Sequence, residues 1–541
     1  MTGGWSPTGE IAAVVQRNAD ERPDGPAIID EQRTCTHAEL ATEVAAVARG
    51  LTGLGVGPGS RVGLLCTNRV EWVTAAYGTL AVGATLAAFP TWARSWDLDH
   101  LIAHSRCEVL LTADRVGTTD LTSVISELVP EISCTDRPGL RSATYPALRE
   151  LVVIGRVPSG ARSIARSFAD LGAGAADVGG SASAAQDSAL VLYTSGSTAR
   201  PKAVRLAQQA AIGHAREVAA RMGVRHDDRI LLPVPLFWSY GGANALMVAL
   251  VTGSTVVLQE TFDAAGALTQ IARHRCTVLY TLPSITRTLL GEPTFSREAV
   301  ATLRRGMTIG PPSDVRAAAV ELGVTEICNA YGSTELYGGA TVTPHDWPLD
   351  RRCTGQGSAL PGNRVAIIDP QTGRVQPPGE LGEIVVSGYT SPGYLDQPDE
   401  TAASFDPDGT FCTGDLGHLD AGGELHFAGR ASEMIRTGGI NVSPLEVEDF
   451  LLTHSAVEEA VVVGVADQKA DQVPIAFVRT ASPHDTDEAT LLAFCRDRIA
   501  AYKVPRRIVL RTIALPRTTT GKPARTSLME EAQALWKGAE G

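Results

Sequence analysis

The 541-residue chain has no closely spaced cysteine pair. Its nine cysteines are odd in number and scattered, and no two of them form a Cys-x-x-Cys pair. A disulfide framework or a zinc site is therefore not expected. We expect buried or idle thiols in a reducing compartment, which favours a cytoplasmic location.

The chain also lacks an excess of positive charge. It has 47 lysines and arginines against 60 aspartates and glutamates, and its formal net charge is −13. An acidic chain of this size is not expected to bind nucleic acid through bulk electrostatics. A local basic patch that holds phosphates remains compatible with this charge.

A continuous apolar run long enough to cross a bilayer is missing as well. Two stretches without charge, 72–93 and 230–259, are interrupted by glycines and prolines, whereas a membrane span needs about 20 strongly apolar residues. The first residues show no basic region followed by an apolar run, so we expect no signal peptide. We expect no membrane span and interpret both stretches as buried strands and helices.

Short apolar runs alternate with helical patterns through most of the chain. RVGLLC (61–66) precedes a helical stretch at about 70–82, and strand-like runs recur at 256–259 and 277–283. This alternation predicts an α/β fold of parallel sheets with covering helices. Residues 157–187 are rich in Ala, Gly and Ser, which is typical of a mobile linker or surface loop.

The pattern changes from about residue 360. RVAIID, GEIVVSG and GELHFAG are short strands with Gly- and Pro-rich turns, which predict a small β unit at about 360–428. Helical and strand patterns then alternate again. We expect a large N-terminal α/β domain over 1–431 that includes the β unit, followed by a small mobile α+β domain over 432–541.

The stretch YTSGSTARPKAV (193–204) follows the strand-like run ALVLYT. Small hydroxyl residues, exposed backbone N–H groups and a lysine suit the binding of phosphate oxygens. The stretch does not fit the G-x-x-x-x-G-K-[ST] pattern, and taken alone it is more typical of a solvated turn than of a phosphate site. The candidate phosphate-binding residues are Thr194, Ser195, Gly196, Ser197, Thr198 and Lys202.

Further motifs follow in order along the chain. They are NAYGSTELYG (329–338), TGDLG (413–417), GR (429–430), RTGGINVSPLEVE (436–448) and PRTTTGK (516–522). With these motifs, nearly the whole chain resembles the acyl-adenylate-forming superfamily, which contains acyl- and aryl-CoA ligases, peptide-synthetase adenylation domains and beetle luciferases. GGINVSPLEVE is most similar to the CoA ligase branch. The resemblance implies that a carboxylate reacts with ATP to give an acyl-adenylate, which then reacts with the thiol of coenzyme A.

The resemblance also assigns roles on the nucleotide side. It implies that Glu335 binds Mg²⁺, that Thr334 contacts phosphate and that Tyr331 stacks on adenine. Taken alone, YGSTE favours a strand-end turn with a surface glutamate, and an aspartate in TGD is common in hairpin turns. The full set of expected nucleotide-binding residues is Gly310, Pro311, Asn329, Ala330, Tyr331, Gly332, Asp415 and Arg430.

The C-terminal motifs receive roles in the same way. Lys522 resembles the lysine that holds the carboxylate and α-phosphate during adenylation, where an ammonium offsets growing negative charge. Ser432 stands at the family's hinge position, and a small polar residue can absorb a backbone rotation. The resemblance places the CoA channel at Arg436, Gly438 and Gly439, although an ordinary glycine turn explains this segment equally.

The acid substrate is expected near PLFWSYGG (235–242) and ELYGG (335–339). Candidate pocket residues are Trp238, Tyr240, Gly241 and Gly338. Aromatic side chains together with small glycines suit a bulky, largely apolar acid. Core packing explains Trp238 almost equally well.

Two alanines depart from the family's usual TSG[ST]TGxPKG pattern. Ala199 and Ala203 stand where glycine is usual, and alanine at a left-handed position costs roughly 1–2 kcal/mol. We therefore hypothesise an acyl-CoA ligase whose adenylation step is weak or absent, and which a separate adenylating ligase supplies with adenylate. The alternatives are a fully competent ATP-dependent synthetase, an adenylation enzyme that loads a separate carrier protein, and a non-catalytic adenylate-binding protein. ATP or the acyl-adenylate, Mg²⁺ and coenzyme A are the expected cofactors.

Overall fold

The computed structural model describes residues 10–133, 140–157, 165–172, 189–194, 201–437, 440–467, 471–482, 486–496, 498–499, 503–518 and 521–540. The chain divides into two compact units. The N-terminal unit takes residues 1–365 and 386–411, and the C-terminal unit takes 366–385 and 412–541. This division joins most of the small β unit to the C-terminal part. The expected boundary near 431 concerns a hinge and stays a prediction.

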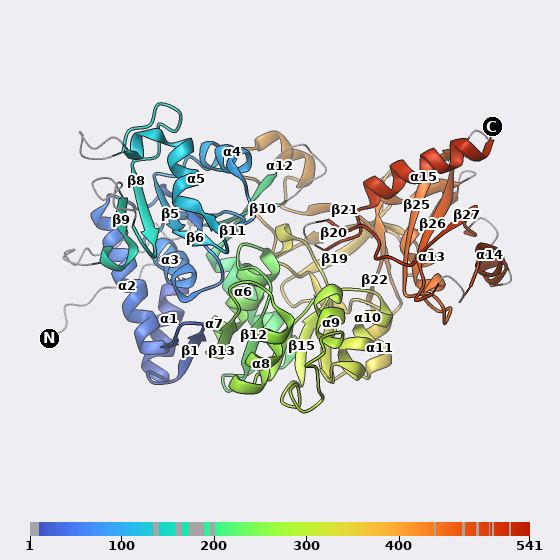
Figure 1. Ribbon diagram of the computed structural model, residues 1–541, viewed down its shortest axis with the longest axis horizontal. Helices are drawn as coiled ribbons and strands as arrows, with labels where there is room; N and C mark the ends of the chain where they lie inside the picture. Colours follow the sequence, from blue (N-terminus) through green and yellow to red (C-terminus); the bar gives the residue numbers. More distant parts are fainter. Residues whose placement is uncertain are drawn as a thin grey trace. The chain divides into compact units, whose positions relative to one another are not determined.

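The N-terminal unit contains a seven-stranded sheet. Its order is β11 (Lys202–Ala207), β10 (Ala189–Thr194), β4 (Thr85–Ala88), β3 (Arg61–Leu65), β5 (Val109–Ala113), β8 (Glu150–Ile154) and β9 (Ala165–Ser167). The pairs from β10 to β9 are parallel, whereas β10 and β11 are antiparallel. Figure 1 shows helices α3 (Val70–Ala81), α4 (Ser95–Ser105) and α5 (Leu121–Leu128) beside this sheet. Strand β5 is buried along its length, as expected for a parallel strand covered on both faces.

A nine-stranded sheet forms the other half of this unit. Its order is β18 (Ser358–Ala359), β17 (Thr341–Val342), β16 (Glu326–Tyr331), β15 (Arg305–Thr308), β14 (Val278–Tyr280), β12 (Arg229–Leu232), β13 (Thr255–Leu258), β1 (Pro26–Ile29) and β2 (Thr34–Thr36). The six strands from β16 to β1 are parallel. Helices α6 (Gln208–Met222), α7 (Leu246–Thr252) and α8 (Ala264–His274) pack on the sheet. The expected parallel sheets with covering helices are confirmed.

Remaining helices of this unit are α1 (Glu10–Glu21), α2 (His37–Gly53), α9 (Pro283–Leu290), α10 (Pro312–Arg316), α11 (Leu349–Thr354) and α12 (Pro398–Ser404). Helix α2 begins where the sequence supplies a capping box, because the Thr36 side chain accepts from the Glu39 amide and the Glu39 carboxylate accepts from the Thr36 amide. One apolar cluster runs through both sheets, from Ile11 to Leu395.

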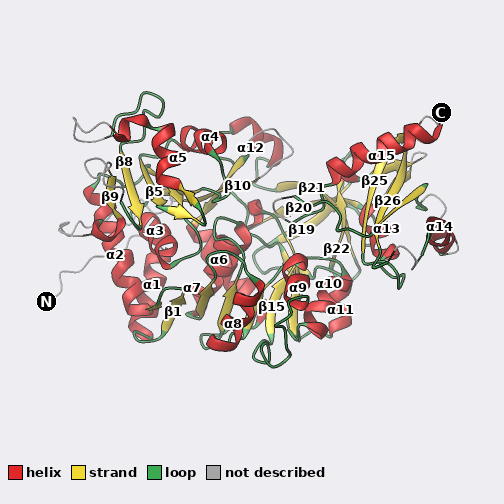
Figure 2. Cartoon of the chain, viewed as in Figure 1, coloured by secondary structure: helices red, strands yellow, loops and turns green. Residues whose placement is uncertain are grey.

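The C-terminal unit carries most of a four-stranded sheet and all of a five-stranded sheet (Figure 2). The first contains β19 (Arg364–Ile368), β20 (Gly382–Ser387), β21 (Phe411–Leu419) and β22 (Leu425–Arg430). The second contains β24 (Ile440–Val442), β23 (Ile435–Thr437), β26 (Asp471–Arg479), β25 (Glu459–Asp467) and β27 (Arg507–Arg511), the last paired with β26. The three short strands predicted between 360 and 430 are confirmed.

Both faces of the five-stranded sheet are covered. Val462 and Val478 pack with helices α13 (Pro444–Leu451) and α14 (Glu488–Arg496), whereas Val461 and Phe477 pack with α15 (Arg525–Glu540). Consecutive side chains of each strand thus pack into the apolar clusters on opposite faces of the sheet, which is the period of two expected for a strand.

One expectation is wrong in part. Residues 165–172 lie inside the stretch predicted to be a linker, yet they form β9 and a short 3₁₀ turn, Phe168–Asp170. Strand β9 pairs with β8, and Leu171 is buried. Sequence composition missed this strand because ARS has no apolar run, and the strand is attached through backbone pairing with β8 and through the buried Ala165.

The expectation of buried thiols is confirmed for most of the described cysteines. Among the described cysteines, seven are buried and Cys412 is partly exposed, and none is in a disulfide. Burial raises the pKa of the Cys107 thiol to about 11. Within the described part of the chain, no helix is long and apolar enough to cross a membrane.

Candidate functional site

The predicted nucleotide-binding residues of the N-terminal unit meet at the carboxyl ends of β15 and β16. Thr308 and Asn329 are partners in this parallel pair, so the segments after them leave the sheet side by side. Asn329 is buried, and its side-chain amide donates to the carbonyls of Gly310 and Gly355 at 3.3 and 3.1 Å. Ligands of open α/β sheets bind at such strand ends.

A tight reversal follows β16. A Cβ atom at Gly332 would lie 2.5 Å from the Cα atom of Gly339, so only glycine permits this approach. Tyr337 and Gly338 have positive φ angles of 55° and 84°, and they turn the chain back on itself. The reversal presents Thr334 and Glu335 in a single 3₁₀ turn, η7 (Thr334–Leu336).

Thr334 connects this turn to the predicted acid-binding segment. Its hydroxyl donates to the Ser239 hydroxyl at 3.1 Å. Ser239 begins the π-helix η5 (Ser239–Ala245), directly after Trp238. The candidate phosphate contact and the candidate acid pocket are therefore adjacent.

Glu335 has a partner that the sequence analysis missed. The Tyr394 hydroxyl donates to Glu335 Oε1 at 2.9 Å. The Lys202 ammonium lies over the ring of the same tyrosine, 4.7 Å from its centroid. Tyr394 stands in the turn-like sequence PGYLDQP, whose composition alone carries no sign of a functional contact.

Thr194 and Lys202 form the last pair of β10 and β11 before the candidate phosphate loop. The Thr194 hydroxyl is 3.5 Å from the Lys202 carbonyl oxygen. The expectations for Ser195, Gly196, Ser197, Thr198 and Ala199 fall outside the described residues.

Ala203 does not have the conformation that would strain an alanine. It lies within β11 opposite Tyr193, and its side chain is buried. Its carbonyl accepts from the Leu395 amide at 2.8 Å, and its amide donates to Gln397 Oε1 at 3.4 Å. Non-glycine residues with positive φ in the described chain are Arg106, Arg275, Tyr337 and Asp396. The expected backbone cost is therefore absent at Ala203.

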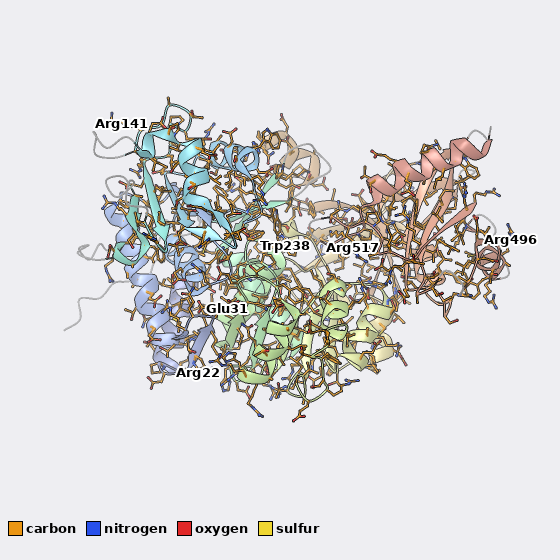
Figure 3. All side chains as sticks on the ribbon, in the orientation of Figure 1. Arg22, Glu31, Arg141, Trp238, Arg496 and Arg517 are labelled. Atoms are coloured by element: carbon orange, nitrogen blue, oxygen red, sulfur yellow. The ribbon has the colours of Figure 1, made fainter. Side chains whose placement is uncertain are left out.

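Trp238, labelled in Figure 3, is half-buried, and it belongs to an aromatic cluster. The Trp92 ring packs edge-on against the rings of Trp238 and Phe237, at centroid distances of 5.6 and 4.7 Å. Trp92 is 41% exposed. Tyr240, in contrast, is buried, and its hydroxyl lies 2.7 Å from the Met307 carbonyl and 3.1 Å from that of Thr281. The Tyr240 hydroxyl therefore links the end of β14 to the end of β15 through these two carbonyl groups.

The glycines predicted to widen the acid pocket have a different explanation. A Cβ atom at Gly241 would lie 2.2 Å from the Pro235 carbonyl oxygen, and one at Gly242 would lie 2.1 Å from that of Leu236. Gly338 is required by its positive φ angle. Close backbone approach accounts for these residues, so they give no measure of pocket size. Whether Gly241 and Gly338 line the pocket stays a prediction.

In the C-terminal unit, Asp415 and Arg430 face each other across β21 and β22. Arg430 Nε lies 3.0 Å from Asp415 Oδ1, and the aspartate side chain is largely buried. The two residues predicted to bind ribose are thus brought together as an ion pair.

The other predicted residues of this unit lie apart along its chain. Ser432 belongs to a 3₁₀ turn, η8 (Ala431–Glu433), and Arg436 belongs to β23. Gly438 and Gly439 fall outside the described residues. Lys522 is exposed, and its carbonyl accepts from the Thr518 amide at 2.7 Å, next to Gly521 with φ of 79°. The roles of all these residues stay predictions.

A groove of about 1500 Å³ lies elsewhere in the N-terminal unit. Two of the arginines that line it form ion pairs, Arg33 with Glu43 and Arg69 with Glu260. None of the described candidate residues lines this groove. Volume alone does not identify the site that the motifs predict.

Comparison with known proteins agrees with this geometry. The family model described as "AMP-binding enzyme" matches residues 15–395, and that described as "AMP-binding enzyme C-terminal domain" matches 446–522. A 3-[(3aS,4S,7aS)-7a-methyl-1,5-dioxo-octahydro-1H-inden-4-yl]propanoyl:CoA ligase of Mycobacterium tuberculosis is 32% identical, with 96% of this chain and 98% of that protein covered. A mitochondrial medium-chain acyl-CoA ligase of Bos taurus is 27% identical, with 97% and 87% covered.

Two solved structures are similar over nearly the full length. The anthranilate CoA ligase AuaEII in complex with anthranoyl-AMP has a TM-score of 0.84 at 27% identity, covering 98% of this chain and 99% of that one. ATP-bound MatB from Rhodopseudomonas palustris has a TM-score of 0.83 at 26% identity, covering 97% and 99%.

Proposed function

The chain belongs to the AMP-binding enzyme family and is an acid–thiol ligase of its adenylate-forming acyl-CoA ligase branch, and from this premise we propose that it carries out both half-reactions on a bulky, largely apolar acid. The position of Ala203 carries this proposal. An alanine in an extended, buried strand imposes no left-handed strain on the stem of the phosphate loop. One of the two reasons for doubting adenylation therefore does not apply.

In the proposed first step, an oxygen of the substrate carboxylate attacks the α-phosphorus of ATP. The bond from that phosphorus to the bridging oxygen breaks, and pyrophosphate leaves. Lys202 and Thr334 would bind phosphate oxygens, and Tyr331 would stack on the adenine. Lys522 of the C-terminal unit is proposed to offset the charge that develops at the carboxylate and α-phosphate.

Glu335 fits a magnesium ion that is shared with ATP. Mg²⁺ is commonly held by one or two carboxylates together with substrate phosphates, and the Tyr394 hydrogen bond engages one oxygen of Glu335. Among the described residues, no cluster of three or more His, Cys, Asp or Glu side chains suits a metal. The single carboxylate of Glu335 is compatible with a Mg²⁺ ion that binds together with ATP. When bound, Mg²⁺ would neutralise phosphate charge.

In the proposed second step, the thiol of coenzyme A loses its proton to solvent and its sulfur attacks the acyl carbon, while the bond from that carbon to the phosphate oxygen breaks and AMP leaves. The segment from Arg436 to Gly439 would approach the thiol carrier, and Ser432 would act as the hinge. Asp415 and Arg430 would hold the ribose hydroxyls, for which their ion pair supplies a fixed carboxylate.

The aromatic cluster supports the proposed class of acid. Trp238 and the partly exposed Trp92 present apolar ring surface next to Ser239, which bonds to Thr334. Such a surface favours an acid with a large apolar or aromatic body over a short one.

A second candidate function is thioester formation from an adenylate made by a separate ligase. Ala199 favours it, because that alanine also replaces a usual glycine of the phosphate loop. Its methyl group would impede adenylation without affecting the step that begins from the adenylate.

Two reactions distinguish these functions. The enzyme is given acid, ATP, Mg²⁺ and coenzyme A in one reaction, and a synthetic acyl-adenylate with coenzyme A in the other. We expect acyl-CoA in both. Product from the adenylate alone would support the second candidate, and product from neither would contradict both.

A further inference from the structure

We propose that Tyr394 is a positioning residue for adenylation, which holds the Glu335 carboxylate and the Lys202 ammonium at fixed places on one ring. The hydroxyl reaches Glu335 Oε1 at 2.9 Å, and the ammonium lies 4.7 Å from the ring centroid. This inference rests on the proposed roles of Glu335 and Lys202 in binding ATP and its metal.

The backbone around Tyr394 is built into the seven-stranded sheet. Tyr394 and Val204 form an antiparallel bridge. On either side of it, the Leu395 amide donates to the Ala203 carbonyl at 2.8 Å, and the Arg205 amide donates to the Gly393 carbonyl at 3.1 Å. The tyrosine is therefore attached to β11, the strand that carries Lys202.

Two further contacts fix the segment beyond the bridge. The Tyr394 amide donates to the Thr401 hydroxyl of α12 at 3.0 Å. Asp396 has a left-handed φ of 54° and forms a two-point ion pair with Arg61 at 2.6 and 3.0 Å. A non-glycine residue keeps such a conformation only where its surroundings impose it.

The ring itself has little freedom. Tyr394 is 5% exposed, and the Phe405 ring packs edge-on against it at 5.9 Å. A hydroxyl on a fixed ring gives the Glu335 carboxylate one defined direction, because hydrogen bonds to ionised acceptors are strong and directional. A cation over an aromatic face is attracted by the ring quadrupole. The Tyr394 side chain thus orients the Glu335 carboxylate of η7 and the Lys202 ammonium of β11.

These contacts predict an effect on one half-reaction only. Glu335 and Lys202 are proposed to act on the β- and γ-phosphates and on their metal, and these groups have left before the thiol attacks. Losing the hydroxyl should therefore slow adenylation and weaken magnesium-dependent ATP binding, and it should spare thioester formation from a supplied adenylate.

The test compares Tyr394→Phe with Tyr389→Phe, a matched control. Tyr389 lies in the same segment, and its ring faces His214 instead. ATP–pyrophosphate exchange, thioester formation from a synthetic adenylate, and the affinity for ATP across a Mg²⁺ series by calorimetry are measured for both. Tyr394→Phe is expected to lower exchange about tenfold or more and to raise the Mg²⁺ concentration needed for half-maximal ATP binding several-fold. Adenylate turnover should stay within about twofold.

Unchanged exchange and unchanged Mg²⁺ dependence in Tyr394→Phe would overturn the inference. Equal losses in both half-reactions would also overturn it, since that pattern indicates a general structural role. If the unmodified enzyme shows no exchange, the proposed function fails. The Mg²⁺ dependence of ATP affinity in the two variants then still decides the role of Tyr394.

Discussion

Ala203 lies directly opposite Tyr193 in the antiparallel pair of β10 and β11, with its methyl group buried. Both of its backbone groups bond to the segment that carries Tyr394. The residue belongs to the stem that supports the phosphate loop. Its difference from the usual glycine is therefore a packing change and not a conformational one.

Restoring glycine at this position should not help adenylation. Ala203→Gly removes a buried methyl and loosens a strand, at a cost of about 1 kcal/mol in the free energy of unfolding. We expect ATP–pyrophosphate exchange to stay level or fall slightly. Ala199→Gly is the matched comparison, and we expect it to raise exchange no more than about tenfold. If Ala203→Gly raised exchange as much as Ala199→Gly does, that result would contradict the strain-free strand position of Ala203.

Trp238 should determine the size of the preferred acid. Trp238→Ala removes ring surface that packs on Trp92, so the KM for bulky apolar acids should rise about tenfold, and that for short acids should change little. Kinetics over a series of acids of increasing size check this. Trp347→Ala is a suitable control, since that ring stacks with Arg351 instead. A uniform loss over the series would argue for core packing alone.

His214 should make the N-terminal unit sensitive to acid. Burial lowers the pKa of its imidazole to about 4, from an ordinary value near 6.5. The unfolded state then binds the extra proton first, so stability is fully present above about pH 6.5 and is lost as the pH falls toward 4. Between pH 7 and 5 this group should cost about 2 kcal/mol of the free energy of unfolding.

Denaturant unfolding at several pH values measures the effect of His214. The neutral variant His214→Gln should show a shallower loss of stability over the same range, whatever its absolute stability. Equal slopes in the two proteins would mean that other buried histidines carry the dependence.

Arg525 should be essential to the C-terminal unit. Its guanidinium pairs at two points with the buried Glu448 carboxylate, at 2.6 and 2.9 Å, and also approaches Glu433. Arg525→Met would leave Glu448 buried without its counter-charge, which costs about 3–5 kcal/mol. Lys503→Met, which breaks the more exposed pair with Glu446, should cost about 0–1 kcal/mol. Thermal unfolding followed by circular dichroism compares them, and similar transition temperatures would refute the difference.

Much of the fold could be predicted because its signals are local. Apolar runs of strand length alternate with helical patterns, and RVGLLC and the helical stretch at about 70–82 correspond to β3 and α3, as expected. The motif residues near 310 and 331 were grouped by the family resemblance alone, and the structure places them at the carboxyl ends of the adjacent parallel strands β15 and β16.

The remaining features depend on contacts between distant segments. Tyr394 contacts Glu335 and Lys202 only because its loop pairs with β11. The sequence PGYLDQP does not predict that pairing. Gly241 and Gly338 were expected to line a roomy pocket, yet the close approach of a backbone carbonyl explains the first and a positive φ angle the second. A sequence shows where glycine occurs, but not which atom would occupy the space of its missing side chain.

The most direct test of the account is ATP–pyrophosphate exchange by the unmodified enzyme with a panel of bulky apolar acids. We expect acid-dependent exchange that requires Mg²⁺ and that precedes any addition of coenzyme A. Absence of exchange with every acid, while the same enzyme converts a supplied acyl-adenylate into acyl-CoA, would contradict it.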